Sequence, residues 1–106
     1  MTEITVQEYY DRHLFIAQGH AGFCKKGEDI VCAAVSALSF TLLEAVRRAE
    51  EEQRLKIVRE VVNDGYMCIE AQSFSFAQER VDEIFDTVTV GLLMLAEKYP
   101  EYVSVN

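Results

Sequence analysis

Cys32 and His20 are the two residues of this chain whose types and spacing best suit nucleophilic chemistry. Cys32 lies in the expected first turn of a long helix, where unpaired backbone N–H groups and the helix dipole favour the thiolate form of a cysteine. His20 precedes it in a glycine-rich segment, where an imidazole can take up a proton and return it. The pattern predicts a cysteine nucleophile with a histidine base.

Two further polar residues accompany this pair. Asp29 directly precedes the expected helix and is a good N-cap, with orientation of His20 as a second role for its carboxylate. Ser36 lies one turn after Cys32, where its hydroxyl can bond back to the carbonyl of Cys32, polarise the thiolate or contact a substrate. Both are expected to support the site.

The backbone around the pair is also suited to catalysis. Gly19, Gly22 and Gly27 would let residues 19–28 fold back, so that the imidazole approaches the thiol. The N–H groups of the first helical turn, with Cys32 and Ala33 as the donors we expect, could hold an oxyanion.

Two other interpretations of these residues stay open. Cys32 could be a small packing residue, since cysteine is often buried. His20, Cys24 and Cys32 could also ligate zinc, with Cys68 or His13 as a fourth ligand. The spacing lacks the close cysteine pair of structural zinc sites, so we expect neither a metal nor another cofactor. Cys24 is then an exposed thiol and Cys68 a core thiol.

The elements that position these residues follow from periodicity. Residues 2–9 and 14–17 alternate as strands, residues 19–28 form a loop, and apolar residues recur at helical spacing from about Ile30 to about Glu51. Residues 55–61 and 66–73 form a hairpin around the turn Asn63-Asp64-Gly65.

The C-terminal third predicts a second long helix. Ser75 and Gln78 resemble a capping box, and an apolar stripe runs from Ala77 to Leu95 before Pro100 ends it. Residues 102–105 could add a short strand. The prediction is an α+β fold, one domain over residues 1–106, with an antiparallel-rich sheet, two helices and the order β-β-α-β-β-α-β.

The amino-acid composition limits the classes of partner that this protein is expected to bind. The formal net charge of −8 argues against a surface that follows nucleic-acid phosphates and favours a basic protein partner. We find no signal peptide and no window approaching the roughly 20 apolar residues of a spanning helix, so we expect a cytoplasmic protein without membrane contact. Three cysteines in such a chain are expected to be free thiols.

The segments Gly19-His20-Ala21 and Gly27-x-Asp29-Ile30-Val31-Cys32-Ala33-Ala34-Val35-Ser36 resemble the signature of the bacterial ribosomal-processing cysteine protease family, Prp. Chain length and element order are similar as well. The resemblance implies that His20 and Cys32 form the catalytic pair, while Asp29 and Ser36 match further motif positions.

The resemblance also implies a substrate and an assembly. Members of the family remove a short N-terminal extension from a large-subunit ribosomal protein of the L27 type, cleaving after an aromatic residue in an apolar segment, and they are homodimers. A basic ribosomal protein agrees with the partner expected from the acidic composition. The alternative function is a non-catalytic dimeric module that binds a basic ribosomal protein, with Cys32 as a packing residue.

Overall fold

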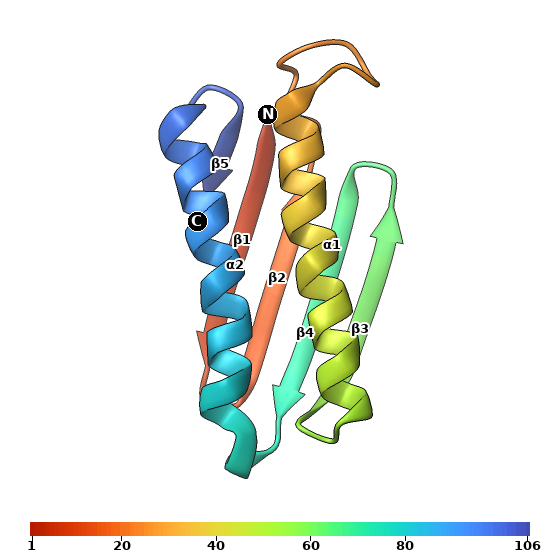
Figure 1. The fold of residues 1–106 in the computed structure, drawn as a ribbon, viewed down its shortest axis with the longest axis vertical. Helices are drawn as coiled ribbons and strands as arrows, with labels where there is room; N and C mark the ends of the chain where they lie inside the picture. The colour runs from red at the N-terminus through yellow and green to blue at the C-terminus, as the bar shows by residue number, and fades with distance from the viewer.

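The computed structural model describes all 106 residues and forms one five-stranded sheet covered by two helices (Figure 1). The strand order across the sheet is β3-β4-β2-β1-β5. Neighbouring strands are antiparallel except β5, which pairs parallel to β1. The elements are β1 (Thr2–Tyr9), β2 (Arg12–Gln18), α1 (Ile30–Glu51), β3 (Leu55–Asn63), β4 (Tyr66–Ser73), a 3₁₀ turn η1 (Ser75–Ala77), α2 (Gln78–Lys98) and β5 (Val103–Val105).

The two helices lie side by side on one face of the sheet and run in opposite directions, as Figure 1 shows. This is an α+β sandwich of two layers with the order β-β-α-β-β-α-β, which confirms the predicted fold class. The other face of the sheet carries no helix.

The core lies between the sheet and the helices because each element buries one face. Alternate residues of the central strands, among them Ile4, Phe15 and Ile69, meet the apolar stripe of each helix. The stripe predicted for the first helix is buried at Val31, Val35, Leu42, Val46 and Ala49, and that of the second at Ala77, Val81, Phe85, Val88 and Leu92. Gly91 brings the helices close, since a Cβ there would lie 3.1 Å from the Leu38 side chain.

The regular alternation of side chains between the two faces of the sheet is interrupted in β3. The pairing of β3 with β4 shifts register between Ile57 and Arg59, which marks a β-bulge. Arg47 of α1 donates two hydrogen bonds to the carboxylate of Glu60, at 3.0 and 2.6 Å, and so ties the helix to this edge strand. The guanidinium of Arg47 lowers the pKa of Glu60.

The capping box predicted at Ser75 and Gln78 is absent. Ser75 lies in the 3₁₀ turn, α2 begins at Gln78, and no side chain caps it. The amide of Gln78 instead donates to the carbonyl oxygen of Tyr10 at 2.7 Å. A long-range bond to the β1–β2 turn has replaced the local one, and the sequence near residue 75 gives no sign of it.

The expectation that no segment is long and apolar enough to span a membrane is wrong for the helix α1. By length and apolar content alone it could cross a membrane, whereas the sequence was expected to hold no such window. In this fold its apolar stripe lies against the sheet, and a core helix satisfies the same criterion.

Leu42→Ala is expected to lower the free energy of unfolding by about 2–5 kcal/mol, because Leu42 is only 1% exposed and its loss leaves a cavity. Urea denaturation measures the change. Ile30→Ala in the same helix also removes three carbons, but from a side chain that is 61% exposed, and should cost less than about 1 kcal/mol. Equal losses would mean that the core is not where the structure puts it.

Candidate active site

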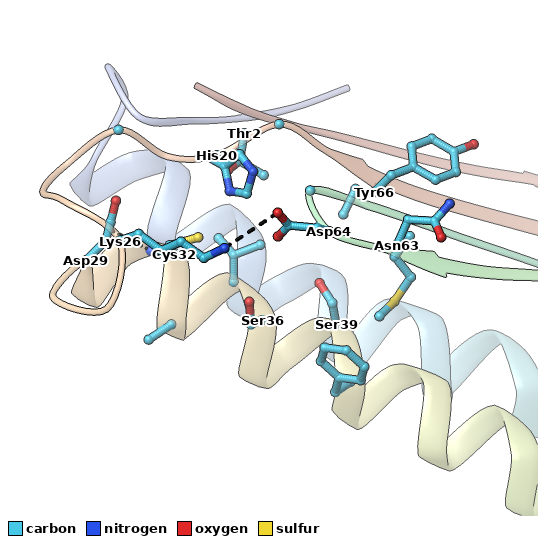
Figure 2. Close-up of a pocket in the computed structure, with 18 of the residues that line it drawn as sticks. Thr2, His20, Lys26, Asp29, Cys32, Ser36, Ser39, Asn63, Asp64 and Tyr66 are labelled. Atoms are coloured by element: carbon cyan, nitrogen blue, oxygen red, sulfur yellow. Dashed lines mark hydrogen bonds and ion pairs between the residues drawn. The ribbon is translucent and has the colours of Figure 1, made fainter.

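A groove of about 690 Å³ runs along α1 and separates it from the ends of β2, β3 and β4 (Figure 2). Its walls include every side chain that the sequence singled out for catalysis, namely His20, Asp29, Cys32 and Ser36, together with the three loop glycines 19, 22 and 27. Residues distant in sequence thus share one surface.

Cys32 is the third residue of α1 and is partly buried at the edge of the core. Its neighbour Val31 faces the sheet and is fully buried, so the thiol lies beside the core stripe of α1. Ser36 is exposed one turn further on and makes no hydrogen bond to the carbonyl of Cys32, unlike Thr41, which donates to Ala37 at 2.6 Å. The Ser36 hydroxyl is therefore free to meet a bound molecule.

Asp29 caps α1, as predicted, and also holds the preceding loop. Its Oδ1 accepts from the N–H of Cys32 at 2.8 Å, and its Oδ2 accepts from those of Phe23 at 3.0 Å and Cys24 at 3.4 Å. The N–H of Cys32 is the main cause of the lowered pKa of Asp29, with smaller contributions from Cys24 and Phe23. Both oxygens accept from backbone N–H groups, and no hydrogen bond or ion pair joins this carboxylate to His20.

The expected oxyanion donors need correction. The N–H of Cys32 is bonded to the Asp29 side chain, and the N–H of Ala33 donates to the Asp29 carbonyl at 3.0 Å. Neither group is free in this structure, because one aspartate satisfies both through its side chain and its backbone. The dipole of α1 remains available to a negative charge at this end of the helix.

His20 is held across the groove from α1, over the β3–β4 turn. The N–H of Gly19 donates to the carbonyl of Gly65 at 2.8 Å. The imidazole then lies on the Cα of Gly65 so closely that a Cβ there would be 2.8 Å from Nε2. Gly19 has a φ of +92°, and a side chain on it would strike the carbonyl of Met1. No hydrogen bond joins His20 to Cys32.

The loop between His20 and Asp29 is attached at both ends and exposed in the middle. Ala21 is buried, and the ring of Phe23 meets those of Tyr99 and Tyr102 edge to face. Beyond these anchors, Lys26 reaches across the groove to Asp64, with 3.6 Å between Nζ and Oδ2 (Figure 2). Both groups are exposed, so this pair holds the loop only weakly.

The alternative zinc set of His20, Cys24 and Cys32 lacks its fourth ligand, because neither His13 nor Cys68 reaches the groove. His13 is the second residue of β2 and His20 follows its end, so the strand separates the two residues by roughly 20 Å. Cys68 is buried on β4 between core residues Met67 and Ile69, and therefore points to the sheet face opposite the helices. Cys24 lines the groove and is exposed, as predicted.

Several groove residues escaped the sequence analysis. The far wall consists of Val62, Asn63, Asp64, Gly65, Tyr66 and Met67, and the floor includes Ser39 and Phe40 of α1. Ser39 is 3% exposed and its Oγ has no hydrogen-bond partner. Its spacing of seven residues from Cys32 placed it on the same helical face, which was the only available signal.

Gly65→Ala is expected to displace the His20 ring, because the added Cβ would occupy the space of Nε2. The NMR signal of the His20 Cε1–H should shift. Gly27→Ala is the matched control: it has a similar φ, +89° against +73°, but open space around the Cβ, so it carries the same backbone strain. An unmoved His20 signal in Gly65→Ala would contradict the contact.

Comparison with known proteins identifies the family. The sequence model described as cysteine protease Prp matches residues 1–104. The curated ribosomal processing cysteine protease Prp of Mycoplasma genitalium is 32% identical over 95 residues, covering 90% of this chain and 88% of the relative. The same-named protein of Mycoplasma pneumoniae is 31% identical over 109 residues, covering 98% and 92%.

Solved structures share the fold. The ribosomal processing protease Prp of S. aureus, in complex with a covalently linked product peptide, superposes with a TM-score of 0.80 at 24% identity, covering 100% of this chain and 98% of that one. SMU.848 from Streptococcus mutans gives a TM-score of 0.73 at 32% identity, covering 100% and 92%. The chain with the capped Cys32 helix and the facing His20 belongs to the Prp family of cysteine proteases.

Proposed function

We propose that this protease removes the N-terminal extension of an L27-type ribosomal protein in the cytoplasm, with Cys32 as nucleophile and His20 as base. The observation that carries the proposal is the shared groove: a thiol at the capped start of α1 faces an imidazole fixed on the β3–β4 turn. The two curated relatives are named as ribosomal processing proteases, which supports the substrate class.

The reaction is acyl transfer in two halves. His20 takes the proton of Cys32, and Sγ attacks the scissile carbonyl carbon. Negative charge then develops on the carbonyl oxygen at the N-terminus of α1, where the helix dipole stabilises it. His20 returns the proton to the leaving amine, and water, with its proton taken by His20, releases the acyl group from Sγ.

The groove suits an extended apolar peptide. Its volume, about 690 Å³, is in the range of sites that bury a drug-sized ligand. Phe40, Val62 and Met67 line it with apolar surface, and the unpaired hydroxyl of Ser39 can bond a peptide group. The net charge of −8 would attract the basic body of a ribosomal protein.

We further propose a homodimer formed through α2. Val90, Leu93 and Met94 are 57%, 50% and 65% exposed and follow the i, i+3, i+4 spacing of one helical stripe. The opposite side of the same helix is buried at Val88 and Leu92. A second copy of this stripe is an occupant of matching apolar chemistry, related by a two-fold axis.

Cys32→Ala and His20→Ala are each expected to lower the rate of cleavage by about 1,000-fold or more, because nucleophile and base act as one unit. The test incubates the protein with an L27-type ribosomal protein that carries its extension and follows the new N-terminus by mass spectrometry. Cys24→Ser is the control, since it removes the other thiol of the groove and should leave cleavage nearly unchanged. Undiminished trimming by Cys32→Ala would exclude the mechanism.

Leu93→Glu is expected to shift the protein from dimer to monomer, because a buried unpaired carboxylate opposes association. Sedimentation equilibrium gives the mass. Gln7→Glu adds the same charge to the sheet face without helices and should leave the dimer intact. If Gln7→Glu dissociates the dimer and Leu93→Glu does not, the interface lies on the sheet.

A further inference from the structure

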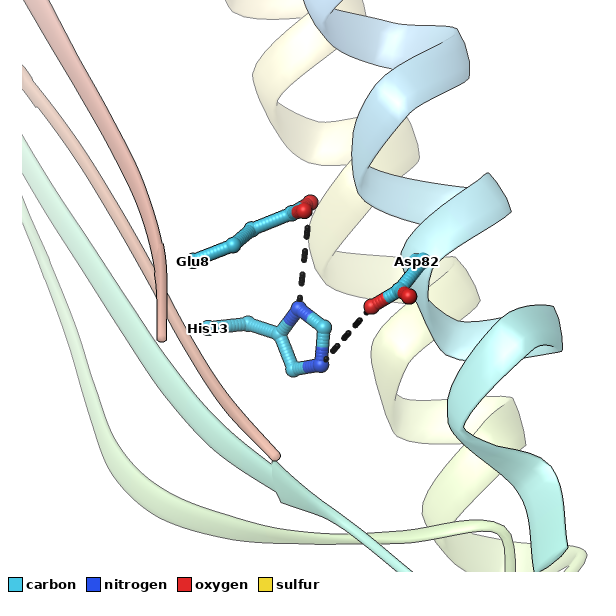
Figure 3. A group of neighbouring side chains, drawn as sticks. All are labelled: Glu8, His13 and Asp82. Carbon is cyan, nitrogen blue, oxygen red and sulfur yellow. Dashed lines mark ion pairs between the residues drawn. The ribbon is translucent and has the colours of Figure 1, made fainter. Parts of the chain in front are cut away.

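A second cluster of titratable side chains lies at the opposite end of the sheet from the groove. His13 at the start of β2 is fully buried and stacks on Phe85 of α2, with ring centroids 4.9 Å apart. Glu8 of β1 approaches its Nδ1, with Oε1 at 3.9 Å, and Asp82 of α2 approaches its Nε2, with Oδ1 at 3.5 Å (Figure 3). The proposed peptidase reaction uses none of these residues.

Hydrogen bonding indicates which nitrogen of His13 carries the proton. Nε2 lies 3.4 Å from the Oγ of Ser73, and that hydroxyl donates to the carbonyl of Asp11 at 3.2 Å. The Ser73 hydroxyl is thus a donor elsewhere and can accept from Nε2–H. Burial lowers the pKa of His13, and this effect outweighs the charges of Asp82, Asp86 and Asp11, which raise it. The lowered pKa favours the neutral ring, with a proton on Nε2 and a lone pair on Nδ1.

That lone pair has no partner, although it is buried. Nδ1 has no hydrogen bond in the structure, and the nearest charged atom is Oε1 of Glu8 at 3.9 Å. A lone pair and a carboxylate oxygen that face each other repel unless a proton or a metal cation lies between them. The unpaired nitrogen is therefore available as a ligand for a cation.

The surroundings of Glu8 are strongly acidic. Burial and the adjacent carboxyls of Asp86 and Asp82 raise the pKa of Glu8 to about 7. An acidic depression of about 430 Å³ on α2, lined by Glu79, Arg80, Asp82, Glu83 and Asp86, opens beside the cluster. A bound divalent cation would offset this repulsion and could enter from solvent.

We propose that His13, through Nδ1, and the carboxylates of Glu8 and Asp82 bind a divalent transition-metal ion of the Zn²⁺ type, with Asp86 as a further carboxylate beside them. The Asp82 carboxylate, whose Oδ1 lies 3.5 Å from Nε2, would turn toward the ion at Nδ1. One ligand atom from each of the three residues lies within 4.8 Å of the other two. Ligand atoms on one zinc ion are about 3.3 Å apart, and rotation of the two part-exposed carboxylates can close the difference. The Nε2–H bond to Ser73 is the outer-shell contact that orients a metal-binding histidine.

An imidazole with carboxylates suits zinc or manganese better than calcium or magnesium, which prefer oxygen alone. The ion would tie β1 and β2 to α2, far from the groove, and thus act as a structural clamp. It takes no part in peptide cleavage.

Calorimetric titration with Zn²⁺ tests the site in full-length protein carrying Cys24→Ser and Cys32→Ser, because the groove thiols would otherwise bind zinc themselves. One ion per chain and a higher melting temperature are expected. Adding Glu8→Gln or Asp82→Asn should each weaken binding by more than about 10-fold. Glu83→Gln removes a charge from the same depression without touching His13 and should leave affinity nearly unchanged.

NMR of the imidazole nitrogens locates the ion in protein that keeps Glu8 and Asp82. This measurement therefore does not depend on whether the Glu8→Gln and Asp82→Asn variants fold. Zinc should shift Nδ1 of His13 and leave His20 unmoved. No uptake, equal affinity in Glu8→Gln and Glu83→Gln, or a zinc-dependent shift at His20 alone would each overturn the proposal. If the protein takes up no zinc, a proton on Glu8, rather than a metal ion, separates Nδ1 of His13 from Oε1 of Glu8.

Discussion

The carboxylate of Asp29 is the interaction on which the groove most depends. It joins the first turn of α1 to the loop that carries His20, by accepting from Cys32 on one oxygen and from Phe23 and Cys24 on the other. Three backbone donors that would otherwise be unpaired are satisfied by one side chain. The thiol and the histidine loop therefore share a single anchor, so displacement of Asp29 would disturb both.

The same hydrogen bonds affect the electrostatics around the thiol. A carboxylate near a thiol is unfavourable for thiolate formation when it is bare. Here the charge of Asp29 is spread over three N–H groups, which leaves less of it to act on Cys32. The side chain of Asp29 accepts from the N–H of Cys32, and its carbonyl accepts from the N–H of Ala33. An oxyanion at this end of the helix would compete with Asp29 for these two donors.

Local patterns in the sequence were enough for most of the fold and for half of the site. The cap at Asp29, the position of Cys32 in the first turn of α1 and the turn at Gly65 depend on neighbours a few residues away, and each was predicted. The contact between His20 and Gly65 joins residues 45 positions apart and appears only when β4 pairs with β2. The bond from Gln78 to Tyr10 and the cluster at His13 are long-range in the same way, and one sequence holds no periodic signal for them.

The bulge in β3 has a consequence for association of the protein. β3 and β5 are the two edges of the sheet, where unpaired backbone groups could recruit another chain. On β3 the bulge interrupts the hydrogen-bonding row, and the charged side chains Lys56, Arg59 and Glu60 flank it. β5 is only three residues long. Neither edge offers a flat, uncharged template, so this fold resists the open-ended strand addition that leads to aggregation.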